Sequence, residues 1–481
     1  MLSTLAFRHL LVHKGRSLFL LLGYGLGVGV MIVLLSVGEA MLTQSADVAL
    51  VGGGEVTVLP QGIDIEAMRS GGISGMFFGI ERARFLTRQL LGGPRHAARV
   101  RAVSPVIENK LLYLTLRGQS VAVRAGGEIP SRVAAVGAAR NIVSGAWRDT
   151  PADSAWIAPT DQQLYDELDH FHLPVTSDSS WGEWHYFNLS PGPDEWWYIT
   201  YLVGGEVPHG RWGGQLLISH RTPDGRYTRY RAVVPADSIV LDTTRADLTL
   251  GGSQVFQRNG TYTLTAEAHG ATGPLSLSLT MQPEKNRFFP PVSLHEGAYP
   301  SGYVVPALSG TATGQICVGS RCVLLTDVPA YHDHNWGVWR SVSWDWGAAR
   351  GREYSLLYGA VYAPEDSVGD AANGAPRLLV ALVDSLGVRQ ILRAATVTYE
   401  GEQRSRGGSG PAAPARFHFV ATRDADTVRI ETEIVDFQAT DRTAAGAKKF
   451  LQMRGAFTLT GTIGGTAVSD SGTGFFETYV E

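Results

Sequence analysis

The sequence has only two cysteines, few lysines and a single long apolar run. Lysine and arginine together number 41 against 45 acidic residues, which gives a formal net charge of −4. No dense basic face is visible, so nucleic acid is not an expected partner. Without a second apolar run of comparable length, the chain cannot be a polytopic transporter. It also lacks a Gly-x-Ser-x-Gly elbow and a convincing Ser-His-Asp series, which gives no support to serine-hydrolase chemistry.

The one long apolar run lies near the N-terminus. Ser17–Gly38 contains 22 residues without a charge, and as a helix it would extend about 33 Å, enough to cross a bilayer. Arg8, Lys14 and Arg16 precede it, whereas acidic residues follow it. The positive-inside rule then predicts a single-pass anchor over residues 1–45 in a bacterial inner membrane, with the remainder periplasmic or extracellular. A cleaved signal peptide is the alternative, although its apolar core normally has only about 7–15 residues.

The two cysteines are Cys317 and Cys322, and they flank a Val-Gly-Ser-Arg insert between short apolar runs. This pattern predicts a hairpin whose two strands bring the cysteines face to face. Outside the membrane, where thiols oxidise, we expect a disulfide. Two free buried thiols are the alternative. A zinc site would need further ligands at fixed spacing, and the cysteines alone do not supply them.

Beyond the anchor, the pattern of short strands and turns predicts an all-β protein. We expect a small mixed α/β stalk region over residues 46–150 and a polar linker over 151–180. From Trp181 onward, short alternating segments recur between turn signals such as Pro-Asp-Gly and Asn-Gly. Two successive antiparallel units, over residues 181–345 and 346–481, follow from this spacing.

The first group of residues that could carry chemistry is Trp181-Gly-Glu-Trp-His-Tyr-Phe-Asn188, followed closely by Glu195-Trp196-Trp197-Tyr198. On a strand, Glu195 and Trp197 would face one way, and Trp196 and Tyr198 the other. So much aromatic surface beside a carboxylate suits a cavity for an apolar or polyene-like ligand. The alternative is a barrel closed by aromatic side chains that act as plugs.

The second group runs from Tyr331 to Gly337. Alternate residues of an extended segment would face opposite sides, with His332, His334 and Trp336 on one and Tyr331, Asp333 and Asn335 on the other. A His-x-His pair is a common metal half-site, which here would need a third ligand from His185, His220 or Glu477. General acid–base chemistry is a second interpretation. A polar cluster that pins two strands is the third.

These segments, together with three others, resemble one protein family in their order and spacing. The five are Glu195-Trp-Trp-Tyr198, Gly210–Arg221, Asp333-His-Asn-Trp-Gly337, Trp344-Asp-Trp346 and Gly474-Phe-Phe-Glu477. The family comprises the carotenoid 1,2-hydratases (hydroxyneurosporene synthases) and the AttH-like proteins called predicted secreted hydrolases. Fungal cyclases of the Diels–Alderase type are also similar. The resemblance extends from about residue 181 to residue 481.

The resemblance implies two consecutive lipocalin-like antiparallel β-barrels with a cavity for a hydrophobic, terpenoid or lipid-like molecule. It implies acid-initiated hydration or cyclisation, with His334 and Trp336 on the family's histidine–tryptophan motif and Asp333 as the adjacent carboxyl. The family's downstream tyrosine–aspartate element has its nearest candidates in Tyr362 and Asp366, at a different spacing. The expected ligand-binding residues are Glu195, Trp196, Trp197, Tyr198, Trp344, Asp345, Trp346, Tyr362 and Glu477. We expect no cofactor and no metal.

The N-terminal part resembles another group of proteins. Its amphipathic lead-in, glycine-rich span and following Gly-rich region are similar to the first helix and periplasmic start of export-type ABC permeases, over about the first 140 residues. This makes ABC exporter components candidate partners. Three functions therefore stay open: a hydratase-like or cyclase-like enzyme, a tethered lipid-binding module without catalysis, and an envelope module of an exporter.

Overall fold

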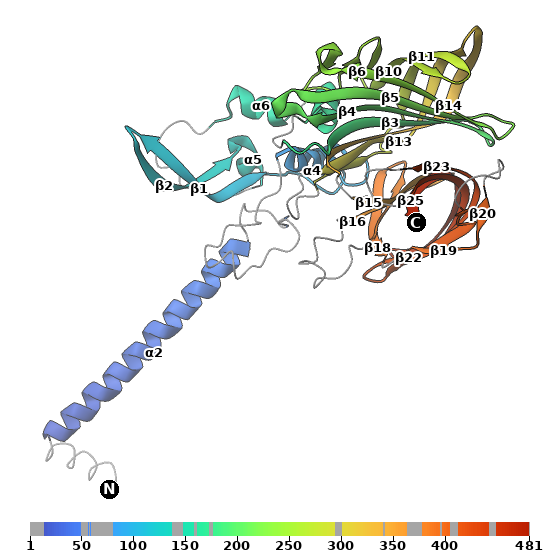
Figure 1. The fold of residues 1–481 in the computed structure, drawn as a ribbon. Helices are drawn as coiled ribbons and strands as arrows, with labels where there is room; N and C mark the ends of the chain where they lie inside the picture. Colours follow the sequence, from blue (N-terminus) through green and yellow to red (C-terminus); the bar gives the residue numbers. More distant parts are fainter. Residues whose placement is uncertain are drawn as a thin grey trace. The chain divides into compact units, whose positions relative to one another are not determined.

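The computed structural model describes most of the chain (Figure 1). The described residues are 14–49, 56, 58, 80–136, 148–157, 161–172, 177–293, 301–339, 342–362, 378–394, 397–404, 412–441 and 449–480. They form two compact units, of which the first combines residues 1–79 with 100–154 and the second combines 80–99 with 155–481. Each unit is described separately.

The first unit contains the apolar helix α2 (Lys14–Ala49) and an antiparallel hairpin. The hairpin strands are β1 (Val106–Leu116) and β2 (Gln119–Glu128), followed by α5 (Pro130–Ala135). Within α2, Lys14–Ser36 has a mean hydropathy of 2.5 and no buried residues, so it is long and apolar enough to cross a membrane. This agrees with a single-pass anchor, although a signal sequence has the same length and composition.

The second unit begins with the helices α4 (Ile80–Gly92) and α7 (Asp161–Asp169), while α6 (Pro151–Ile157) lies at the boundary between the units. An eight-stranded antiparallel barrel follows, closed by the pairs β6–β10 and β10–β11. Its strands are β3 (Trp181–Gly192), β4 (Glu195–Glu206), β5 (Arg211–Arg221), β6 (Tyr227–Pro235), β10 (Thr261–Gly270), β11 (Gly273–Pro283), β13 (Gly302–Val318) and β14 (Arg321–Val338). Shorter strands extend the sheet, namely β7 (Ile239–Leu241), β8 (Leu248–Leu250), β9 (Ser253–Arg258) and β12 (Phe289–Ser293).

A second eight-stranded antiparallel barrel follows and is closed by the pair β18–β22. Its strands are β15 (Ser343–Gly351), β16 (Ser355–Tyr362), β17 (Leu378–Asp384), β18 (Gly387–Ala394), β22 (Arg416–Arg423), β23 (Asp426–Asp441), β24 (Lys449–Ile463) and β25 (Thr466–Val480). The short strand β19 (Thr398–Glu400) pairs with β22, and β20 (Gln403–Arg404) pairs with β21 (Ala412–Ala413). The predicted fold, two consecutive all-β barrels, is confirmed.

Alternation along the strands explains why these residues form barrels. In β11, Leu275, Leu277, Leu279 and Met281 are buried, while the serine and threonine residues between them are exposed. The period of two points every apolar side chain into the lumen, where each buried leucine contributes about 1.5–3 kcal/mol. Each barrel lumen is filled in this way by its own apolar cluster.

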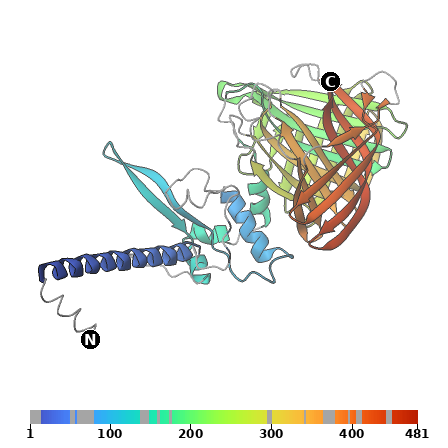
Figure 2. The same ribbon diagram turned by 90° about the horizontal axis from the view of Figure 1, so that it is seen from below.

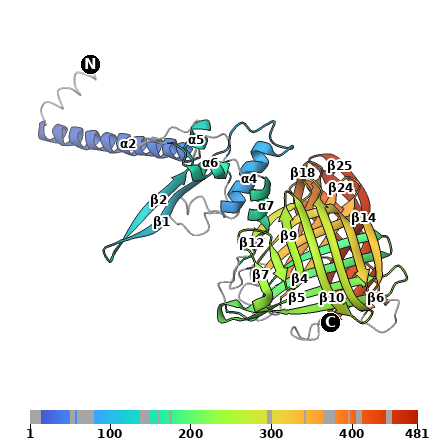
Figure 3. The same cartoon turned by 90° about the horizontal axis from the view of Figure 1, so that it is seen from above.

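The two barrels lie next to one another in Figure 1 and overlap in the views from below and above (Figures 2 and 3). A third, aromatic-rich cluster holds them together. We call this contact surface the seam. Its buried members are Tyr186, Trp196, Tyr198, Phe289, Tyr303, Val305, Leu308, Tyr331, Trp346, Ala348, Leu357, Ala381, Val383 and Phe475. They come from outward-facing positions of both barrels, so the barrel walls carry buried side chains on their outer surface at the seam as well as in the lumen.

The predicted disulfide is present between Cys317 and Cys322, whose Cα atoms lie 4.0 Å apart. The two residues are opposite one another at the turn that joins β13 to β14. The hairpin predicted from the Val-Gly-Ser-Arg insert is therefore confirmed as well.

Candidate functional site

The strands β3 and β14 form the wall between the lumen of the first barrel and the seam. They pair without a register shift from Ala330↔Leu189 to Val338↔Trp181. Because side chains alternate along both strands, every second residue faces the lumen and its neighbours face the seam. Gly337, with φ of 144°, ends this regular stretch, and a Cβ there would overlap Ser301.

On the seam side, Glu477 of β25 is a buried carboxyl. Tyr186 donates a hydrogen bond of 2.8 Å to its Oε1, and the Trp344 indole N–H lies 3.3 Å from its Oε2. Gln452 also donates to Oε1, at 3.2 Å. Burial raises the pKa of Glu477 to about 7, although these three hydrogen bonds act to lower it. This carboxyl therefore exchanges its proton near neutral pH.

A second carboxyl, Asp333 of β14, is buried on the same side. The Tyr331 hydroxyl donates to its Oδ2 at 2.7 Å, and the Asn335 amide donates to its Oδ1 at 2.6 Å. Burial raises the pKa of Asp333 to about 8 against the hydrogen bond from Tyr331, and the nearby charge of Glu477 raises it further. The seam thus contains two interacting carboxyls among aromatic rings.

A group of half-buried aromatic rings lies next to Glu477, and we call it the aromatic rim. Its members are Trp184, Trp339, Trp344, Phe450 and Tyr479. Trp184 and Trp339 have ring centroids 4.9 Å apart, and Trp339 and Trp344 have theirs 5.9 Å apart. Trp344 also contacts Phe450 and Tyr479 of the second barrel. Half-exposed rings that lead to a buried acid suit the binding of an apolar molecule.

Unsatisfied polar atoms lie in the outward-facing positions of β3 and β4. Asn188 and Tyr198 are both buried, yet neither amide atom of Asn188 nor the Tyr198 hydroxyl has a hydrogen-bond partner among the described residues. An unpaired buried polar group costs about 1–3 kcal/mol, so such groups usually meet water or a ligand.

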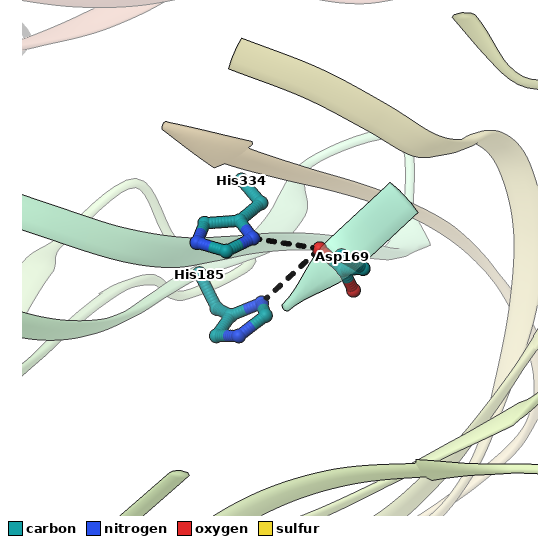
Figure 4. A group of neighbouring side chains, drawn as sticks. All are labelled: Asp169, His185 and His334. Carbon is teal, nitrogen blue, oxygen red and sulfur yellow. Dashed lines mark hydrogen bonds and ion pairs between the residues drawn. The ribbon is translucent and has the colours of Figure 1, made fainter. Parts of the chain in front are cut away.

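On the lumen side lies a different polar group, which we call the lumen cluster. It consists of Asp169, Glu183, His185, His332 and His334, all fully buried, with His172 beside them. Figure 4 shows Asp169 of α7 between His185 of β3 and His334 of β14. The Asp169 Oδ1 lies 2.8 Å from His334 Nδ1 and 3.9 Å from His185 Nδ1.

The remaining contacts of the lumen cluster surround its histidines with carboxylates. His334 Nε2 lies 2.8 Å from Glu183 Oε1, so both ring nitrogens face a carboxylate. Burial lowers the pKa of His334, but the hydrogen bonds to Asp169 and Glu183 outweigh burial and raise it to about 9. Burial instead lowers the pKa of His185 well below its usual value.

The structure separates the three residues expected to be catalytic. Asp333 faces the seam, whereas His334 belongs to the lumen cluster and Trp336 stacks on His172 at 3.9 Å on that same side. As expected from alternation along a strand, Asp333 and His334 lie on opposite faces of the wall. The roles of the individual residues stay predictions.

The expected ligand-binding residues are also divided. Trp196, Tyr198, Trp344, Trp346 and Glu477 lie at the seam or its rim. Trp197 points into the first barrel, where it stacks on His220, and Glu195 pairs with the same histidine. Asp345 is bonded to Tyr399 and Thr478 of the second barrel. Tyr362 ends β16, and its side chain lies outside the described residues, as does Asp366.

Sequence reasoning missed Asp169, Glu183, Tyr186 and Gln452. Asp169 lies in the segment interpreted as a linker, yet it opens the run Asp-His-Phe-His at 169–172, whose two histidines were an available signal. Glu183 lies within the aromatic segment Trp181–Asn188, and only the pairing of β3 with β14 places it beside His334. Nothing local marks Gln452.

Comparisons with known proteins were made at the levels of sequence and fold. No family model matches the sequence, and no curated protein matches it. Among solved structures, an AttH protein from Nitrosomonas europaea has 16% identity and a TM-score of 0.43, covering 62% of this chain and 92% of that one. Kievitone hydratase from Nectria haematococca has 11% identity and a TM-score of 0.42, covering 62% and 88%. CghA has 12% identity and a TM-score of 0.43, covering 65% and 94%. The chain is thus similar to AttH, kievitone hydratase and CghA, at low identity to each.

Proposed function

We propose that the chain is a membrane-anchored, hydratase-like or cyclase-like protein that binds a terpenoid or lipid-like molecule at the seam. The observation that carries the proposal is Glu477, a fully buried carboxyl that lies under the aromatic rim and titrates near pH 7. The motif resemblance to carotenoid hydratases points to the same chemistry. The anchoring part rests on the apolar segment Lys14–Ser36.

The reaction would begin with transfer of the Glu477 proton to an isolated carbon–carbon double bond. This step forms a C–H bond as the carboxyl O–H bond breaks, and it leaves a tertiary carbocation, which the aromatic rings beside Glu477 would stabilise through their quadrupoles. Water then adds to the cation and returns a proton to the carboxylate, which completes hydration. In a cyclisation, a second double bond of the same molecule attacks the cation instead, and loss of a proton restores the acid. Asp333 is the second carboxyl of this site.

A test in two stages separates binding from catalysis. Native mass spectrometry of the full chain in detergent should detect a co-purified isoprenoid or lipid. Incubation with acyclic isoprenoids such as geranylgeraniol should then give a product that is heavier by one water, or an isomer of the same mass. Glu477→Gln should keep the ligand and lose the product, whereas Glu431→Gln, at an exposed carboxyl of the same barrel, should keep both. Unchanged turnover by Glu477→Gln would rule out the proposed acid.

A ligand without any product would favour the second candidate, a tethered binding module without catalysis. The two orphaned side chains at the seam, Asn188 and Tyr198, are the observation that favours it, because they could orient a ligand without reacting with it.

A further inference from the structure

We propose that the lumen cluster is a structural binding site for a divalent transition metal, best suited to Zn²⁺. The four ligand groups are the Asp169 carboxylate and the imidazoles of His185, His332 and His334. They come from three elements, α7, β3 and β14, and all four are fully buried in the first barrel. The proposal concerns the face of the wall opposite the seam and does not depend on the proposed reaction.

The spacing of the ligand atoms fits a tetrahedral ion. Ligands at about 2.0–2.1 Å from Zn²⁺ are separated from each other by about 3.3–3.4 Å. His332 Nε2 lies 3.3 Å from both His185 Nδ1 and Asp169 Oδ2. His334 Nδ1 and His185 Nδ1 lie 2.8 Å and 3.9 Å from Asp169 Oδ1, on either side of that value. The ligand atoms of Asp169, His185 and His334 all lie within 4.8 Å of one another, and His332 adjoins this set through its contacts with His185 and Asp169.

The outer hydrogen bonds of the imidazoles favour a metal over a simple hydrogen-bond network. The Nδ1 of His332 lies 3.1 Å from the backbone carbonyl of Tyr186, which can only accept, so this nitrogen carries the proton. In a neutral ring, the lone pair on Nε2 then faces an Asp169 oxygen at 3.3 Å. A metal ion between these two acceptors would bind both of them. Metal-bound histidines characteristically donate their other N–H to a carbonyl or carboxylate in this manner.

The other ligands have matching outer partners. Glu183 accepts from His334 Nε2, which gives the carboxylate–histidine–metal arrangement. Tyr262 donates to Asp169 Oδ2 at 2.6 Å and fixes the carboxylate. His185 Nε2, fully buried, has no partner among the described residues, so the inward nitrogen of this ring must provide its favourable interaction.

Charge balance leads to the same conclusion. Asp169 and Glu183 bring two negative charges into the closed barrel, and one divalent ion neutralises both. The competing cation is a proton on His334, which also bridges the two carboxylates. With four protein ligands and no open position, the ion would attach α7 to the barrel rather than activate water.

The test measures metal in the full chain purified in detergent. Elemental analysis should find about one zinc per chain, or the chelator-treated chain should take up one Co²⁺ with the visible absorption of a tetrahedral site. His185→Gln should weaken Co²⁺ binding at least about 100-fold, and Glu183→Gln about 10–100-fold. His220→Gln, at a histidine of the same barrel that pairs with Glu195 outside the cluster, should bind as the wild type does.

Two results would overturn the proposal. One is a folded wild-type chain that takes up neither Zn²⁺ nor Co²⁺, which would assign the cluster to the His334 proton. The other is equal weakening by His220→Gln and His185→Gln, which would place the ion elsewhere. If His185→Gln does not fold, Glu183→Gln decides alone, because it changes an outer partner and leaves all four ligand groups in place.

Discussion

Both faces of the β3–β14 wall contain buried carboxyl groups, but these groups have different neighbours on the two faces. On the lumen side, the carboxylates of Asp169 and Glu183 lie against the imidazole of His334. On the seam side, Glu477 and Asp333 meet only neutral donors, and their pKa values rise as a result of burial. The difference teaches that a buried carboxyl that meets only neutral donors has a raised pKa, whereas a cationic partner opposes the effect of burial.

The largest effect should come from removing the carboxylate on the lumen side. Asp169→Ala leaves three buried imidazoles and the Tyr262 hydroxyl without their shared acceptor. We expect the free energy of unfolding to fall by about 3–5 kcal/mol, as for other broken buried ion pairs. Urea denaturation followed by tryptophan fluorescence measures this. A loss below 1 kcal/mol would show that the lumen cluster does not hold the barrel together.

Glu477→Gln should give the opposite phenotype. Loss of a general acid typically lowers the rate by about 10²–10⁴-fold, whereas the neutral amide keeps the volume of the carboxyl, and its oxygen can still accept from Tyr186 and Gln452. We therefore expect turnover of an isoprenoid substrate to disappear while the urea midpoint is kept or rises. A variant that unfolds instead would place Glu477 among the structural groups and remove the contrast between the two faces.

The pH dependence of stability sharpens the contrast further. The pKa of Glu477 is about 7 in the folded protein against an ordinary value of 4.5, so the folded state binds the proton more tightly. This contribution to stability is complete below pH 4.5 and is lost as the pH rises through 7, by up to about 3 kcal/mol. The slope between pH 5 and pH 8 should be smaller in Glu477→Gln than in Glu431→Gln. Equal slopes would contradict the assignment.

The disulfide lies at the end of β14 remote from both sites and provides a control for each of them. Replacing Cys317 and Cys322 by serine opens a short loop, whose closure is worth about 2 kcal/mol in the chain-entropy model. We expect that loss in urea denaturation, with metal uptake and turnover unchanged. Loss of metal uptake or of turnover would show that the hairpin turn affects the sites on the β3–β14 wall from a distance.

The smallest effect should be at the aromatic rim. Trp344→Leu keeps an apolar side chain but removes the ring contacts with Trp339 and Tyr479 and the N–H directed at Glu477. Affinity for a bound isoprenoid should fall by about 1 kcal/mol, since ring contacts contribute about 0.5–1.5 kcal/mol beyond area. Intrinsic fluorescence titration with geranylgeraniol measures it. Unchanged affinity would move the binding site away from the rim.

The fold was largely predictable because its signals are local. Leu-Ser alternation in β11 and the Cys317–Cys322 spacing each specify a strand or a turn within a few residues. The faces of residues 331–336 also follow from alternation alone. What could not be predicted is which neighbour each face meets. Asp169 reaches His334 across 165 residues, and Tyr186 reaches Glu477 across 291, through barrel closure and barrel packing that no local pattern encodes.

The gap-free pairing of β14 with β3 makes this wall unusually sensitive to changes in chain length. Successive side chains of residues 331–336 face opposite sides of the wall, so they belong in turn to the lumen side and to the seam side. A deletion of one residue within this stretch would turn each following side chain to the opposite face of the wall. Carboxyls of the seam side would then face the imidazoles of the lumen cluster, and histidines would face the aromatic rings of the seam. A single substitution alters one of the two sites, whereas this deletion would disrupt both. We therefore expect the segment to tolerate substitutions far better than insertions or deletions.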